Sequence, residues 1–61
     1  MLAAGQTWSY GKYTRKIVEV IPGTDLEDPA VRVFVNGRDR TCILTVKSLR
    51  TWIAHYKAVL T

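Results

Sequence analysis

Residues that carry chemistry are scarce in this 61-residue sequence. A single cysteine, Cys42, allows no disulfide within the chain, and together with a single histidine, His55, it is too few for a closed zinc site. The four glycines stand singly, so no glycine-rich phosphate loop is present. Cys42 is predicted to be buried and His55 to lie on the polar side of a helix, so they form no Cys-His pair. We therefore expect no catalytic centre, no metal and no cofactor, and a protein that is not an enzyme.

Long apolar runs are also missing. The first five residues lack a basic region followed by an apolar run, so we expect neither a signal peptide nor a membrane span. With its single thiol, the chain is predicted to be cytoplasmic and to have no membrane partner. An apolar fraction of 48% excludes a disordered tail, and residues 1–61 are predicted to form one small domain with a thin core.

Acidic residues are few and unevenly placed. Five of them stand against nine Lys and Arg, for a formal net charge of +4, and Asp25, Glu27 and Asp28 share one short segment. Outside that segment the sequence has nine cations and only two acids, Glu19 and Asp39, which leaves a charge of +7. Such a surface predicts a polyanionic partner, either nucleic acid or an acidic protein surface, and no small-molecule substrate is evident.

The strongest pattern that is present indicates a β-hairpin. Apolar residues alternate with polar ones on both sides of Asn36-Gly37. This dipeptide tolerates the positive φ angles of a type I′ turn, whose twist matches that of paired antiparallel strands. We therefore predict strands at 31–36 and 38–46, joined by this turn.

Two further strands are predicted before the hairpin. Runs rich in aromatic and β-branched residues indicate strands at 6–10 and 13–21. Pro22-Gly23 is predicted to end the second strand in a type II turn, in which the glycine takes a positive φ. The acidic segment 24–29 is then a loop.

The C-terminal segment has the period of an amphipathic helix. Ser48 is the predicted N-cap, because its hydroxyl can accept from an orphaned backbone N–H in the first turn. The helix either continues to Leu60 or ends near Tyr56, with 57–60 extended and closing a barrel. Trp8 and Trp52 are predicted core aromatics. The apolar residues on one helical face are Leu49, Trp52, Ile53, Tyr56, Val59 and Leu60.

Four strands followed by a helix predict a small β protein, either a partly open barrel or a four-stranded antiparallel sheet, with the C-terminal helix as its cap. The chain also resembles small SH3-like barrel proteins, which bacteriophages and other mobile elements often encode as stand-alone proteins. The resemblance implies an SH3-like barrel and a binding module rather than an enzyme. It transfers no functional residue, because the family has no fixed site motif. The residues that carry it are Gly5-Gln6-Thr7-Trp8, the basic run before Ile17, the hairpin, and Ser48-Leu49-Arg50 with Trp52, Ile53 and Tyr56.

Strand alternation divides the predicted sheet into an aliphatic face, which is the predicted core, and a mixed face. The mixed face combines Ile17, Phe34 and Ile43 with Arg15 and Arg32. That mixed face is free to bind a partner, or else the helix covers its apolar residues. The predicted core face is aliphatic and consists of Val18, Val20, Val31, Val33, Val35, Cys42, Leu44 and Val46.

The mixed face predicts a nucleic-acid-binding surface. Phe34 offers a ring for stacking, and neighbouring cations offer contacts to phosphates. The alternative is a protein-interaction module, either a self-associating homodimer or an inhibitor of a host protein, with an interface that depends on Phe34 or Ile43. The predicted nucleic-acid-binding residues are Lys12, Tyr13, Arg15, Lys16, Arg32, Phe34, Arg38 and Arg40.

Overall fold

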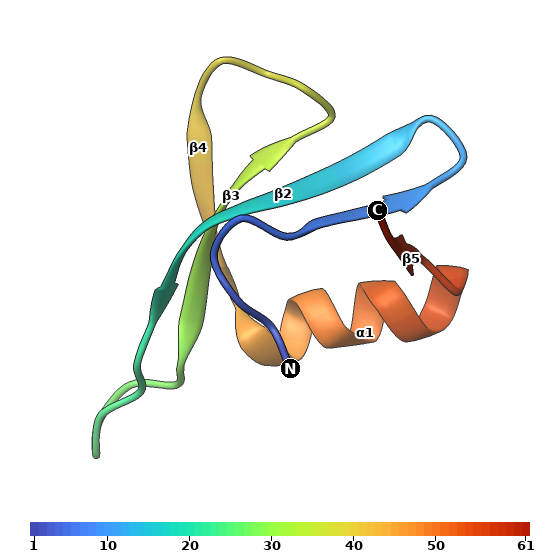
Figure 1. Ribbon diagram of the computed structural model, residues 1–61. Coiled ribbons are helices and arrows are strands. Elements are labelled where there is room, and N and C mark those ends of the chain that lie inside the picture. The colour runs from blue at the N-terminus through green and yellow to red at the C-terminus, as the bar shows by residue number, and fades with distance from the viewer.

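Five strands and one helix follow one another in the computed structural model, which describes residues 1–61 (Figure 1). The strands form one antiparallel sheet in the order β4-β3-β2-β1-β5. The predicted β protein with one C-terminal helix is confirmed, but the sheet has five strands, and it is no closed barrel because β4 and β5 are its edges. The elements are β1 (Thr7–Tyr10), β2 (Tyr13–Ile21), β3 (Ala30–Val35), β4 (Thr41–Thr45), α1 (Val46–Tyr56) and β5 (Val59–Leu60).

The predicted turn at Asn36-Gly37 is present, with φ angles of 54° and 74°. It does not join β3 and β4 directly, because residues 36–40 form a longer loop and the first pair of the ladder is Phe34 with Thr41. The backbone of Asn36 bonds to β2 instead of β4. Relative to a two-residue hairpin the register moves by two residues, so the predicted faces of β3 and β4 are preserved.

The β2–β3 connection needs glycine for a different reason than predicted. Gly23 has no positive φ, so the type II turn is wrong. A Cβ atom at this position would lie 2.8 Å from Cδ of Pro29 and 2.9 Å from its backbone nitrogen. Glycine is therefore required here by the close approach of the two ends of the loop.

A β-bulge after Ile17 changes the faces of β2. Ile17 pairs with Val33 on the core side, and the extra residue, Val18, is 42% exposed. Val20 returns to the core side opposite Val31, but it is 38% exposed and does not belong to the buried core. The prediction was therefore wrong for Ile17 and Val18, because a bulge interrupts the strict alternation on which it relied. The fully buried residues are Ile17, Val31, Val33 and Leu49.

Helix α1 covers this inner face of the sheet (Figure 1). Trp8 and Trp52, predicted as core aromatics, are partly buried against the core. The opposite, outer face has no helix on it, and Ile43 there is 56% exposed. The alternative in which the helix covers Ile17, Phe34 and Ile43 is therefore wrong for Phe34 and Ile43, whereas Ile17 does lie in the core with Leu49 of the helix.

The edge strand β4 also differs from the prediction. Cys42 was predicted to be buried, but its side chain is exposed. It shares the inner face with Val33, yet β4 has a neighbouring strand on one side only. Val46, the last residue assigned to this strand by alternation, begins α1 instead.

The apolar period favoured the longer of the two predicted helices, but the shorter one forms. Helix α1 ends at Tyr56, and Lys57 takes a left-handed conformation (φ 54°, ψ 43°) from which its N–H donates to the carbonyl of Ile53. Strand β5 then pairs with β1, with Leu60 opposite Trp8, so it widens the sheet rather than closing it. The eleven residues of α1 fall far short of the roughly 20 apolar residues of a bilayer-crossing helix, and the chain has no longer helix.

The start of α1 gives a first testable prediction. The N-cap is Thr45, not Ser48: the Thr45 hydroxyl accepts from the backbone N–H of Ser48 at 3.0 Å. We expect Thr45→Ala to lower the free energy of unfolding by about 1 kcal/mol in urea titrations, since it leaves that N–H without its cap. Ser48→Ala is the matched control and should cost nothing, because alanine is the better helix former. A larger loss for Ser48→Ala than for Thr45→Ala would contradict this assignment.

Candidate nucleic-acid interface

The two ends of the sheet carry opposite charge. The β1–β2 turn and the β3–β4 loop lie at one end, and the β2–β3 loop with Asp25, Glu27 and Asp28 lies at the other (Figure 1). We call residues 10–16 and 36–40 the basic end. Asp39 is its only acid, and its cations are Lys12, Arg15, Lys16, Arg38 and Arg40.

The side chain of Asn36 holds the basic end together. Its Oδ1 accepts from the backbone N–H of Thr14 at 3.0 Å and from Nη1 of Arg15 at 3.1 Å. The Asn36 N–H donates to the Thr14 carbonyl at 2.9 Å. These bonds fasten the β3–β4 loop to the start of β2, so the cations of both segments are displayed by one connected scaffold.

A shallow groove of about 400 Å³ lies on the outer face at this end. Lys16 and Phe34 face each other across β2 and β3, and Arg38 enters from the loop. Phe34 is half-buried, and the adjoining residues are small or polar. We call this the outer groove; it is lined by Thr7, Thr14, Lys16, Phe34, Gly37, Arg38 and Asp39.

Two predicted site residues lie on the other side of the sheet. Arg15 pairs with Trp8 and Val35 on the inner face, and its guanidinium lies 4.6 Å from the centroid of the Trp52 ring. Tyr13 pairs with Tyr10, so it too faces inward. The prediction that Arg15 shares a face with Phe34 is wrong. It assumed unbroken alternation along β2 with Val18 in the core, whereas the bulge after Ile17 puts Ile17 and Arg15 on the core side.

The remaining predicted cations do not line the outer groove. Arg32 is on the outer face, where its Nε lies 3.2 Å from Oε1 of Glu19. Both side chains are substantially exposed, so this ion pair stabilises the fold by at most about 1 kcal/mol. Arg40 lies in the β3–β4 loop, and Nζ of Lys12 lies 5.8 Å from the Tyr13 ring centroid. The structure thus brings together Lys16, Phe34 and Arg38 in the outer groove and places the other predicted residues elsewhere.

Some residues at this end escaped the sequence-based prediction. Thr7 and Thr14 line the outer groove, and the Asn36 amide ties the two segments together. Asn36 was identified only as a turn former, and nothing in the sequence signals its bond to β2. Tyr56 of α1 lies near Tyr10, Tyr13 and Arg15 and was also missed as a possible site residue. Its helical period placed it on the apolar face of the helix, but that pattern is equally typical of a core residue.

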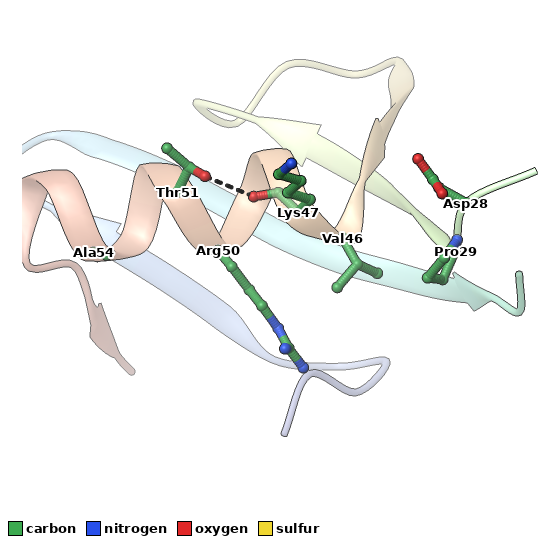
Figure 2. Close-up of a pocket in the computed structure, with 7 residues that line it drawn as sticks. All are labelled: Asp28, Pro29, Val46, Lys47, Arg50, Thr51 and Ala54. Carbon is green, nitrogen blue, oxygen red and sulfur yellow. Dashed lines mark hydrogen bonds between the residues drawn. The ribbon is translucent and has the colours of Figure 1, made fainter.

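The largest hollow in the surface lies away from these residues. It has a volume of about 540 Å³ and lies between the β2–β3 loop and the first turns of α1 (Figure 2). Asp28 lies on one side of it, and Arg50 extends away from Asp28 (Figure 2). No ion pair joins Asp28 to Lys47 or Arg50. Its charged groups do not converge, so we do not place the functional site there.

No three side chains of His, Cys, Asp or Glu lie close enough together to hold a metal ion.

Comparison of the chain with protein families, curated proteins and solved structures found no match. The basic end offers cations that can pair with phosphate oxygens, and the outer groove adds the phenyl ring of Phe34, which can stack.

Proposed function

We propose that this chain is a small, non-catalytic nucleic-acid-binding module that contacts its partner through the outer groove and the surrounding basic end. The observation that carries the proposal is the convergence of Lys16, Phe34 and Arg38 on a sheet face that α1 leaves uncovered. Lysine and arginine contacts to phosphates supply affinity, and an aromatic ring between them can stack on a base.

The charge distribution supports the same proposal. The acidic β2–β3 loop lies at the far end of the sheet, so repulsion between its carboxylates and phosphates is weakest when the basic end approaches first. A field of this kind orients a polyanion during its approach as well as holding it afterwards. The formal net charge of +4 acts in the same direction.

The likeness to small SH3-like barrel proteins of phages and mobile elements belongs to this proposal. It is supported by the consecutive antiparallel strands with short connections and by the pairing of the last strand with the first. The unpaired edges of β4 and β5 distinguish this open sheet from a closed barrel. A module of this type would serve as a binding or accessory protein within a larger process.

The proposal is tested by reversing charge in the outer groove. We expect the double variant Lys16→Glu/Arg38→Glu to bind mixed-sequence DNA about 100-fold more weakly, because each charge-assisted contact is worth about 1.5 kcal/mol or more. The slope of log K against log salt concentration should fall by about two, one for each lost phosphate contact. Fluorescence anisotropy at several salt concentrations measures both quantities, and circular dichroism checks that the variant is folded.

A matched control separates the groove from net charge. Lys47→Glu/Arg50→Glu replaces the same two residue types at exposed positions on α1, and it lowers the formal charge from +4 to neutral just as the first pair does. The control should keep most of the affinity. Equal losses in the two double variants, or no measurable binding by the parent protein at low salt, would contradict the proposal.

The second candidate function is protein interaction, and one observation favours it. Ile43, on the outer face of the edge strand β4, is 56% exposed, and Val18, at the bulge of β2, is 42% exposed. An apolar interface is nearly indifferent to salt, whereas binding through about five phosphates weakens by about 10²–10³-fold between 50 and 200 mM salt. Salt-independent self-association or capture of a protein that is lost in Ile43→Lys would favour this alternative.

A further inference from the structure

An aromatic cleft opens on the inner side of the basic end, between the sheet and the C-terminal half of α1. It has a volume of about 470 Å³. Strand β1 and β2 contribute the sheet side, and α1 contributes the opposite wall. We call it the aromatic cleft; its lining residues are Tyr10, Tyr13, Arg15, Asn36, Trp52 and Tyr56.

The three tyrosines of the cleft form a stack. The ring of Tyr10 lies between the other two, 4.8 Å from that of Tyr56 and 6.0 Å from that of Tyr13, with interplanar angles of 24° and 16°. Each of the three tyrosine residues is exposed by 41–43%. Stacking covers the ring faces that the tyrosines turn toward one another, so the surface left for a ligand is the exposed remainder of Tyr13 and Tyr56 at the two ends of the stack.

The charges in the cleft decide which aromatic ligand fits. The guanidinium of Arg15 already lies over Trp52 at 4.6 Å, and the ammonium of Lys12 lies near Tyr13 at 5.8 Å. An aromatic cage for a cationic ligand such as a methylammonium group would have to hold it beside these two charges, at a cost in repulsion. A flat ring attached to a phosphate matches the cleft better, because its ring meets the tyrosines and its negative charge meets Arg15 and Lys12.

The position of the cleft connects it to the outer groove. Arg15 and Lys16 are neighbours in β2, and they point to the inner and outer faces respectively. A flexible chain of phosphates can therefore pass around this end of the sheet and contact both residues. A rigid duplex cannot follow so sharp a path, and its bases are not free to leave their stack without an energetic cost.

We propose that the aromatic cleft stacks an unpaired base of a single-stranded nucleic acid, whose phosphates contact Arg15 on the inner side and Lys16 on the outer side. This inference rests on the proposed function and refines it: the outer groove supplies contacts to phosphates, and the cleft makes the protein selective for single strands.

The test compares three probes of equal length, about ten nucleotides, within the span that small single-strand-binding folds cover. They are a single-stranded oligothymidylate, the same strand with abasic sites in place of its bases, and a duplex. We expect the base-bearing single strand to bind about 5- to 150-fold more tightly than the abasic strand, the range for loss of one base–aromatic stack. The duplex should also bind more weakly than the base-bearing strand.

Variants locate the effect in the cleft. Because Tyr10 lies between Tyr13 and Tyr56, one base stacks at one end of the row, so one of Tyr13→Leu and Tyr56→Leu should remove most of the preference for the base-bearing strand, while both leave affinity for the abasic strand unchanged. Tyr13→Phe keeps the ring and should keep the preference. The two leucine variants alter different elements, so if one fails to fold the other still gives a result.

The outcomes are separable from those of the proposed function. If the parent protein binds base-bearing and abasic strands equally and both leucine variants behave like it, the cleft does not stack bases, although binding through the outer groove stands. If it prefers the duplex, the path around the end of the sheet is also excluded. If it binds none of the probes at low salt, the proposed function fails together with this inference.

Discussion

Val33→Asp is expected to abolish folding. The side chain of Val33 has no exposed surface and lies in the four-residue core beneath α1. An unpaired carboxylate there costs several kcal/mol. A domain of this size is stabilised by only about 3–5 kcal/mol in total, so the substitution removes most or all of its stability. Circular dichroism and the dispersion of amide resonances should report an unfolded chain at 25 °C.

Val18→Asp is the matched control for that experiment. It makes the same chemical change on the neighbouring strand, but Val18 is the extra residue of the bulge and is 42% exposed. We expect it to cost no more than about 1 kcal/mol, the span of strand preferences at open positions. Strict alternation in β2 would instead place Val18 in the core. An unfolded Val18→Asp variant would therefore show that the bulge is assigned incorrectly.

Leu49→Ala should produce the second large effect. Leu49 is the only fully buried residue of α1, and it contacts the sheet core formed by Ile17, Val31 and Val33. Truncating a buried leucine costs about 2–5 kcal/mol, the sum of lost transfer energy and the cavity that remains. In so thin a core this should lower the urea midpoint sharply or leave α1 detached from the sheet.

Leu26→Ala provides the comparison for Leu49→Ala. Leu26 is 94% exposed in the β2–β3 loop, so the same truncation removes almost no contact there. Its effect on the free energy of unfolding should stay within about 0.5 kcal/mol. Similar losses for the two variants would mean that Leu49 does not anchor the helix.

The positions of the elements were largely predictable. Strand β2 spans the predicted residues 13–21, and the Asn36-Gly37 turn forms with two positive φ angles. The amphipathic period identified α1, although its start lies two residues before the predicted cap at Ser48. These features follow from preferences of neighbouring residues, such as the tolerance of glycine for positive φ and the match between helical period and apolar spacing.

The faces of β2 were not predictable. Nothing in the run from Tyr13 to Ile21 indicates where its alternation is interrupted, since Ile17, Val18 and Val20 are all apolar and suit either side. The pairing of Ile17 with Val33 is a contact across the sheet, and it places Ile17 in one buried cluster with Val31, Val33 and Leu49. The error at Ile17 also misplaced Arg15, two residues earlier.

The candidate residues could be named from the sequence, but their arrangement could not. The eight residues do gather around one end of the sheet or on its outer face, as the turns required. Only Lys16, Phe34 and Arg38 meet in the outer groove, while Tyr13 and Arg15 face the aromatic cleft. Asn36, which connects the two surfaces, was predicted only as a turn residue.

The sequence by itself determined the order of strands and helix, the position of the turns, and the separation of acidic and basic charge along the chain. Each of these depends on residues that are close together in the sequence. The tertiary structure alone decided which side of β2 meets the helix, that Cys42 is exposed, and that β5 joins β1 rather than closing a barrel. These depend on which distant segments pack together, because the neighbouring strand and the core decide which side chains a bulge or an edge strand buries.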